Sequence, residues 1–210
     1  MLRELLITGV ALALTSSCTQ TAETPHTLAA EPQAAADHAL IVFQKLVNPD
    51  NFKSLGLDSL DEAKQAKLGA PLEIFNIGLE QLRGYKAGDD PETLLVKSSE
   101  TVYPLLVNGQ VKSSVTVVHK ESGYQPSSFG NADVVKRLVG AEKQENGTSF
   151  IVRVPALNMF FLGNRTDGKL VLTPIIDDSR MELRRGEARP ADLVIVQLVP
   201  IASAYNGEPM

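Results

Sequence analysis

The clearest structural signal in this chain is TVYPLLVNGQVKSSVTVV, at residues 101–118. Two β-rich runs flank Asn108-Gly109, and both of these residues tolerate the positive φ angles of a type I′ turn. The stretch therefore predicts a β-hairpin. Pro104 cannot donate a hydrogen bond to a neighbouring strand, so we expect its strand to lie at a sheet edge or to start there.

Further strands are predicted on both sides of this hairpin. Residues 72–77 alternate between apolar and polar side chains, and residues 124–129 follow the hairpin through a short glycine-containing turn. Residues 149–154 and 169–176 are predicted strands of the last third of the chain, and residues 163–168 are the expected turn before the second of them.

Helical patterns alternate with these strands. Ordered structure is expected to begin with a helix at residues 37–47, and the Ser59-to-Glu62 spacing is typical of a capping box that opens a second helix. Asn131 is a candidate N-cap for a helix over 132–142. In the segment 190–205, Pro190 favours a helix whereas the valines and isoleucine that follow favour a strand, and we expect a helix.

This order of elements predicts an α+β fold. We expect a mostly antiparallel sheet with helices on one face, and N-terminal helices before the sheet. One globular domain is predicted over 37–210, with possible sub-halves at 70–143 and 148–205. The layout resembles cystatin-like and PepSY-like secreted modules, in which a helix precedes a curled meander.

The N-terminus has the layout of an export signal. Arg3 precedes an apolar run at residues 5–14, and small residues lead from this run to Cys18, the only cysteine of the chain. A transmembrane helix needs about 20 apolar residues, so the run is too short to span a bilayer.

Cys18 at the expected cleavage site resembles the lipobox of bacterial lipoproteins. Thr15-Ser16-Ser17 precede it, and Leu14 lies one position earlier than in the family pattern. The resemblance implies a signal peptide at 1–17, lipidation of Cys18 and a membrane anchor in the cell envelope. Thr19, in place of an aspartate, favours the outer membrane if the cell has one. The alternative is an ordinary cleaved signal and a soluble secreted or periplasmic protein.

The residues after the cysteine predict a tether. The stretch TQTAETPHTLAAEPQAAA has a single large apolar side chain, Leu28, and no lysine or arginine. Such a sequence buries too little surface to offset the entropy of ordering it. We therefore expect residues 18–36 to form a flexible tether.

Composition limits the possible partners. A formal net charge of −5 provides no field for holding nucleic acid, so none is expected as a partner. The chain has no tryptophan and only 5% aromatic residues, which argues against a carbohydrate-binding platform. The remaining expected partners are the membrane, through the lipid, and a protein of the envelope.

The sequence contains no pattern that indicates catalysis, a cofactor or a metal site. His119 is the only histidine within the predicted domain beyond its first helix, and metal sites usually need closely spaced ligands. The acidic pairs Asp89-Asp90 and Asp177-Asp178 fall in predicted loops, where such residues commonly form turns. The arginines at residues 180–189 alternate with acidic residues, which indicates a solvated loop with compensated charge.

The apolar stretch Met159-Phe160-Phe161 can be explained in two ways. It either forms a central strand buried on both sides or exposes one face as a contact patch, and burial is the better expectation. These three residues and Tyr103 are the candidates for partner binding. The hairpin at residues 103–118 would offer a strand edge for the same purpose.

Three functions are compatible with the sequence. We expect a lipid-anchored, non-enzymatic envelope protein that serves as a binding or assembly accessory module. The alternatives are an envelope hydrolase with a carboxylate base, and a protease inhibitor of the cystatin-like or propeptide-like kind.

Overall fold

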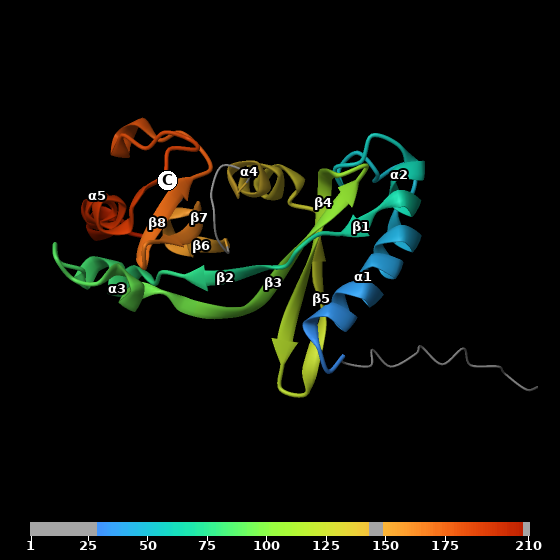
Figure 1. Ribbon diagram of the computed structural model, residues 1–210, viewed down its shortest axis with the longest axis horizontal. Helices are drawn as coiled ribbons and strands as arrows, with labels where there is room; N and C mark the ends of the chain where they lie inside the picture. Colours follow the sequence, from blue (N-terminus) through green and yellow to red (C-terminus); the bar gives the residue numbers. More distant parts are fainter. Residues whose placement is uncertain (1–28, 143–148, 208–210) are drawn as a thin grey trace, which may run out of the picture.

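The computed structural model describes residues 29–142 and 149–207. These residues form one nine-stranded, mostly antiparallel sheet with helices packed against it, which confirms the predicted α+β class (Figure 1). The strand order is β5-β4-β3-β2-β6-β7-β8-β9, and β1 pairs with β3. Among the described strands only β2 and β6 pair in parallel.

The strands are β1 (Lys67–Leu68), β2 (Leu72–Asn76), β3 (Val96–Val107), β4 (Gln110–Lys120), β5 (Gly123–Phe129), β6 (Phe150–Val154), β7 (Met159–Thr166), β8 (Lys169–Pro174) and β9 (Arg189–Pro190). The α-helices are α1 (Pro32–Leu46), α2 (Leu60–Gln65), α3 (Leu79–Gly84), α4 (Ala132–Glu142) and α5 (Ala191–Ala204). Short 3₁₀ helices are η1 (Pro91–Leu94), η2 (Pro155–Leu157) and η3 (Ser179–Met181).

The predicted hairpin is confirmed as β3 and β4. Asn108 and Gly109 have φ angles of 52° and 74°, and Val107 pairs with Gln110 across the two-residue turn. The same geometry recurs between β7 and β8, where Asp167 and Gly168 have φ angles of 51° and 74°. The turn predicted at 163–168 was therefore too long, because β7 continues to Thr166.

Pro104 was expected at a sheet edge, and this prediction was wrong. β3 is an interior strand with β4 along one side and both β1 and β2 along the other. β1 ends at Leu68 and β2 begins at Leu72, so the neighbouring strand is interrupted where Pro104 lies. The Pro104 carbonyl accepts a hydrogen bond from Gly69 N at 2.7 Å, and the missing N–H of the proline falls at this gap.

The start of the ordered domain was also predicted wrongly. α1 begins at Pro32 rather than at residue 37, and Ala29 already pairs with Tyr124 of β5. Ala35 and Ala36 are buried at exposed fractions of 2% and 0%. Alanine is the strongest helix former and allows a helix to lie close to a sheet, so a stretch without large side chains still packs here.

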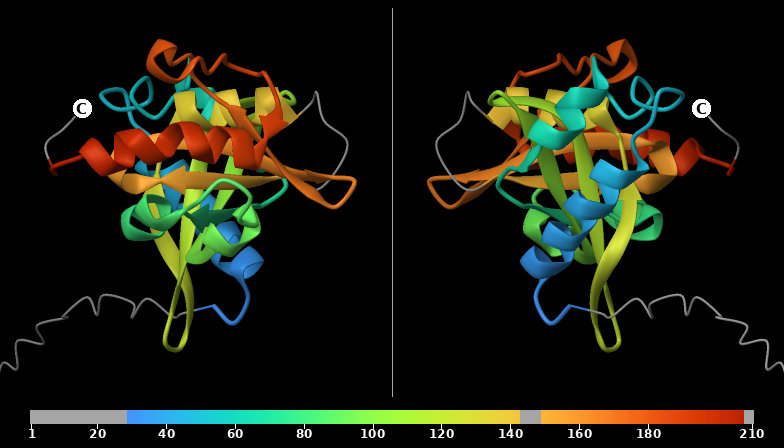
Figure 2. Two further views of the ribbon diagram at one scale, coloured as in Figure 1. Left: turned by 90° about the vertical axis from the view of Figure 1, so that its left-hand side faces the viewer. Right: turned by 90° about the vertical axis from the view of Figure 1, so that its right-hand side faces the viewer.

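Helices cover both faces of the sheet and not only the one face that was expected. Successive residues of a strand point to opposite faces. Val102 packs in the cluster with Leu138 of α4, whereas Tyr103 packs in the cluster with Phe43 of α1. Figure 1 shows α4 on the face toward which the sheet bends, with α1 and α5 on the other face. In Figure 2, α5 (red) lies in front of the sheet in the left view, and α1 (blue) lies in front of it in the right view. We call the face under α4 the concave face.

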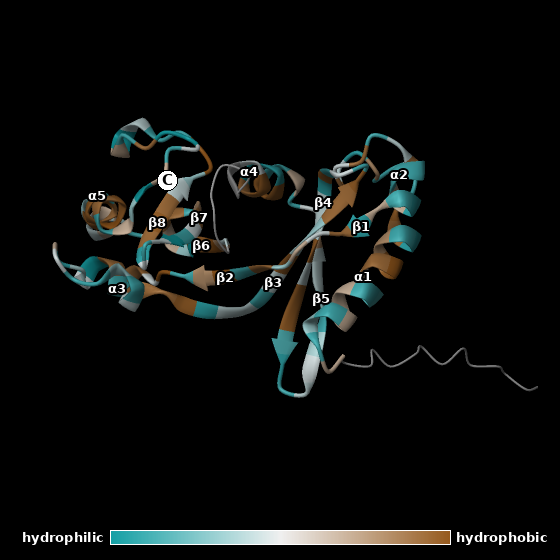
Figure 3. Cartoon of the chain, viewed as in Figure 1, coloured by the Kyte–Doolittle hydropathy of each residue, from teal (hydrophilic) through white to brown (hydrophobic). Residues whose placement is uncertain are grey.

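The last apolar segment forms α5, as expected. Val194, Ile195, Leu198 and Ala202 are buried against β8 and its neighbours, at a spacing that places them on one side of a helix. Hydrophobic residues cover much of α5, β2 and β8 in Figure 3. The helix therefore owes its stability to the packing of its apolar side rather than to the propensity of its β-branched residues.

Replacing Gly163 by alanine is expected to lower the free energy of unfolding by about 1–3 kcal/mol. Gly163 lies in β7 opposite Phe150 of β6, and an added Cβ would lie 2.5 Å from the Phe150 ring. Urea denaturation followed by circular dichroism measures the change.

Gly140→Ala is the matched control. Gly140 is exposed in α4, and an added Cβ would meet nothing within 4 Å. Alanine there should raise the free energy of unfolding by up to about 1 kcal/mol because it favours the helix. An equal effect of the two substitutions would contradict the described packing of β6 against β7.

Candidate functional site

A cavity of about 210 Å³ lies between α4 and the concave face of the sheet. Its walls come from α4 and from six neighbouring strands, β5, β4, β3, β2, β6 and β7. Alternation along these strands sends every second side chain to this face. The cavity therefore collects residues that are far apart in the sequence.

One wall of the cavity is apolar. Ile74 and Ile151 are opposite each other in the parallel pair β2–β6, and each has an exposed fraction of at most 3%. Leu138 of α4 packs against them, and the half-buried Phe160 of β7 completes this wall. An apolar ligand group placed here would be shielded from water.

The opposite wall is polar and is made of small side chains. Ser114 and Thr116 of β4 have exposed fractions of 2% and 6%, and Ser128 lies across from Thr116 on β5. The Ser114 hydroxyl donates a hydrogen bond to the carbonyl of Gly130. Asn131 lies at the rim, directly before α4, with a left-handed backbone at a φ of 55°.

An ion pair closes one end of the cavity. Arg153 Nη2 of β6 donates to Glu100 Oε2 of β3 at 2.9 Å, and Arg153 Nε donates to Asn76 Oδ1 of β2 at 3.0 Å. The Arg153 and Glu100 side chains are 25% and 29% exposed. One guanidinium therefore joins three strands and neutralises the carboxylate in the cavity.

Most of the residues predicted to bind a partner lie in the core. Met159 and Phe161 have exposed fractions of 5% and 0%, which confirms the burial that was the better expectation for this stretch. Tyr103 is 2% exposed, so none of these three residues offers a surface patch to a partner. Burial also raises the pKa of the Tyr103 phenol. The fourth candidate, Phe160, lines the cavity under α4.

The hairpin also offers no free edge for a partner strand. β3 lies between β4 and the β1–β2 pair, and β4 lies between β3 and β5. This arrangement contradicts the expected pairing of a partner with the segment 103–118.

The other polar candidates lie at the surface or in turns. His119 is exposed, with its ring 4.7 Å from that of Tyr124. Asp90 and Asp178 cap the short helices η1 and η3, as expected of turn residues. Arg180 forms hydrogen bonds with Asp178 and thereby lowers the pKa of that carboxyl, which confirms local charge compensation.

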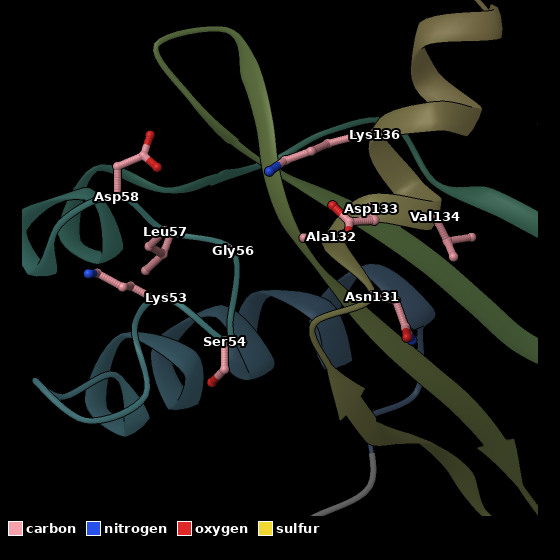
Figure 4. A pocket seen from close by; sticks show the side chains of 10 residues that line it. All are labelled: Lys53, Ser54, Gly56, Leu57, Asp58, Asn131, Ala132, Asp133, Val134 and Lys136. Carbon is pink, nitrogen blue, oxygen red and sulfur yellow. The ribbon is translucent and has the colours of Figure 1, made fainter.

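A wider and more open cleft lies beside the first turn of α4, between this helix and the loop at residues 53–58 (Figure 4). Lys53 points away from α4, so its charge does not converge with that of Lys136. Lys112 approaches Asp58 and Glu62 nearby, and the hydrogen bond from Lys112 lowers the pKa of Asp58. The charged groups of this region are thus engaged with one another or directed to solvent.

Glu100, Thr116 and Arg153 were not predicted from the sequence. Arg153 could have been noticed as a lone charge inside the apolar run FIVRV. Its partner Glu100 lies 53 positions away, and no local pattern joins the two. Only the pairing of β2 with both β3 and β6 brings them together.

Comparisons with known proteins identify no relative. No protein-family model matches the chain, and neither a curated protein nor a solved structure matches it. The likeness to cystatin-like and PepSY-like modules therefore stays a prediction. Within residues 29–142 and 149–207, no helix combines the length and hydropathy that crossing a membrane would need. Cys18 lies outside the described residues.

Arg153→Met is expected to lower the free energy of unfolding by about 1–2 kcal/mol, because Asn76 and Glu100 lose a partly buried charged donor. The control is Lys97→Met, which removes the exposed ion pair between Lys97 and Glu73 and should change the free energy by about 0.5 kcal/mol or less. Chemical denaturation of both variants measures the difference. Equal effects would contradict the conclusion that Arg153 stabilises the sheet by joining β6 to β2 and β3.

Proposed function

We propose that this chain is a lipid-anchored, non-enzymatic protein of the bacterial cell envelope that acts as a binding module, with its ligand in the cavity under α4. The observation that carries the proposal is the partly open cavity itself, which joins an apolar wall to a few polar groups. This combination is typical of small-molecule sites. A binding module of this kind could serve an envelope protein as an accessory or assembly factor.

The N-terminal sequence supports the proposed location. Residues 5–14 and Cys18 have the layout of a lipoprotein signal, and residues 19–28 would connect the lipid to the first described residue, Ala29. Ala29 pairs with Tyr124 at the start of β5. The domain would therefore be joined to the membrane at the end of the sheet where β5 begins.

The ionisable groups of the cavity favour binding over chemistry. A general base needs a free lone pair directed at the substrate proton. Glu100 instead accepts a hydrogen bond from Arg153 at 2.9 Å. The guanidinium therefore holds one of the two carboxylate oxygens of Glu100 and fixes its position.

An envelope hydrolase is the second candidate, and Glu100 is the observation that favours it. Glu100 and the hydroxyl groups of Ser114 and Thr116 line the same cavity. If the native protein hydrolyses a bound ester or amide and Glu100→Gln does not, the chain is a hydrolase and the proposal of a non-enzymatic binding module is overturned. Binding of such a compound without its hydrolysis would support the proposed binding module.

Lipidation is tested by metabolic labelling with a fatty acid in the native host. The native chain should carry the label, and Cys18→Ala should not. Label in both chains, or in neither, would contradict the proposed anchor.

The ligand site is tested by native mass spectrometry of the protein purified from its own envelope. Val102 lies in the cavity wall, so Val102→Phe should remove any co-purified small molecule. Val96→Phe is the matched control in the same strand, since Val96 is 53% exposed and outside the cavity. If the Val102 variant folds poorly, Val134→Phe narrows the cavity from the half-exposed side of α4. A bound molecule retained in these folded variants would contradict the assignment.

A further inference from the structure

Thr116 is a buried residue whose hydroxyl group no described residue satisfies. The residue is only 6% exposed and lines the cavity, and no hydrogen bond joins its side chain to the rest of the described structure. The Ser114 hydroxyl, by contrast, donates a hydrogen bond to the Gly130 carbonyl and is therefore already satisfied within the protein. Among the described residues, the fully buried hydroxyls without a partner are those of Ser113 and Ser149, so the Thr116 hydroxyl is open to the cavity, and a partner can come from there.

The charges around the cavity cancel. Arg153 and Glu100 form an ion pair, and the remaining polar residues of the lining, on β4 and β5 and at the start of α4, are neutral hydroxyls and one amide. A carboxylate that approached Arg153 would also meet Glu100, and an ammonium group that approached Glu100 would meet Arg153. A charged ligand would therefore lose its hydration without gaining an unopposed counter-charge.

The volume of the cavity limits the apolar part of the ligand. Sites for drug-sized ligands measure about 300–1,000 Å³, and an engineered cavity of about 150 Å³ holds one benzene molecule. The volume of about 210 Å³ lies between these values. It suits one ring or one short branched chain, with a small polar group attached.

We propose that the cavity takes an uncharged amphiphile, with its apolar group against Ile74 and Ile151 and its hydroxyl or amide group bonded to Thr116. This inference rests on the proposed function, because it specifies the ligand of the same site. It goes further in stating which chemical class is accepted and which residue selects it.

The test uses the full-length protein in detergent, labelled at the isoleucine methyl groups and observed by NMR. Ile74 and Ile151 report on the cavity, whereas Ile41 and Ile176, which are 50% and 42% exposed, report on the surface. The probes share one ring and differ in the attached group: benzyl alcohol, benzamide, benzoate, benzylamine and toluene.

Benzyl alcohol and benzamide should shift the Ile74 and Ile151 signals and leave those of Ile41 and Ile176 in place. Benzoate and benzylamine should bind at least about tenfold more weakly, because their charges are not compensated in the cavity. In Thr116→Val, the affinity for benzyl alcohol should fall about fivefold to tenfold, since one hydrogen bond is lost. Toluene has no polar group, so its affinity should not fall.

The outcomes separate this inference from the proposed function. If no probe shifts the cavity signals, the ligand site itself is contradicted. If benzoate or benzylamine binds as well as benzyl alcohol, the site stands and the uncharged class is overturned. If Thr116→Val weakens toluene and benzyl alcohol equally, the substitution has changed the shape of the cavity and Thr116 does not select the ligand.

Discussion

The parallel pairing of β2 with β6 is the constraint on which the rest of this structure depends. Ile74 lies opposite Ile151 in this pair, and Ile77 N donates to the Arg153 carbonyl at 2.8 Å just beyond it. Parallel strands need a long connection between them, and here the connection holds the β3–β5 meander and then α4. The chain returns across the sheet through α4, so this helix lies over the junction of the two halves. Arg153 then ties β6 to both β2 and β3.

The cavity follows from this arrangement and from side-chain size. Val135 and Leu138 of α4 pack on the apolar residues of the junction, where the helix is close to the sheet. The same helix also passes β4, where Ser114 and Thr116 stand in place of large side chains. Small residues leave space that packing would otherwise fill, and their hydroxyls make that space polar on one side. The position of α4 over the sheet thus accounts both for the packed junction and for the cavity beside it.

The sequence predicts what short-range chemistry decides. Asn108-Gly109 specifies the central hairpin, and most of the longer strands and helices are predicted, whereas α3 and the two-residue strands β1 and β9 are not. The errors arise where tertiary contacts override a local rule. Pro104 is tolerated inside the sheet because the neighbouring strand is interrupted there. α1 begins at Pro32 because buried alanines pack its first turns, although a run of alanines does not indicate a core in the sequence. The pairing of Arg153 with Glu100 has no local signal at all.

The central claim is that the space beneath α4 is a ligand site and not merely a poorly packed part of the core. A crystal structure of the protein purified from its native envelope tests this claim most directly. We expect electron density for a compact molecule against Ile74 and Ile151, with a polar atom within hydrogen-bonding distance of the Thr116 hydroxyl. Density for ordered water alone, or side chains that close the space, would contradict it.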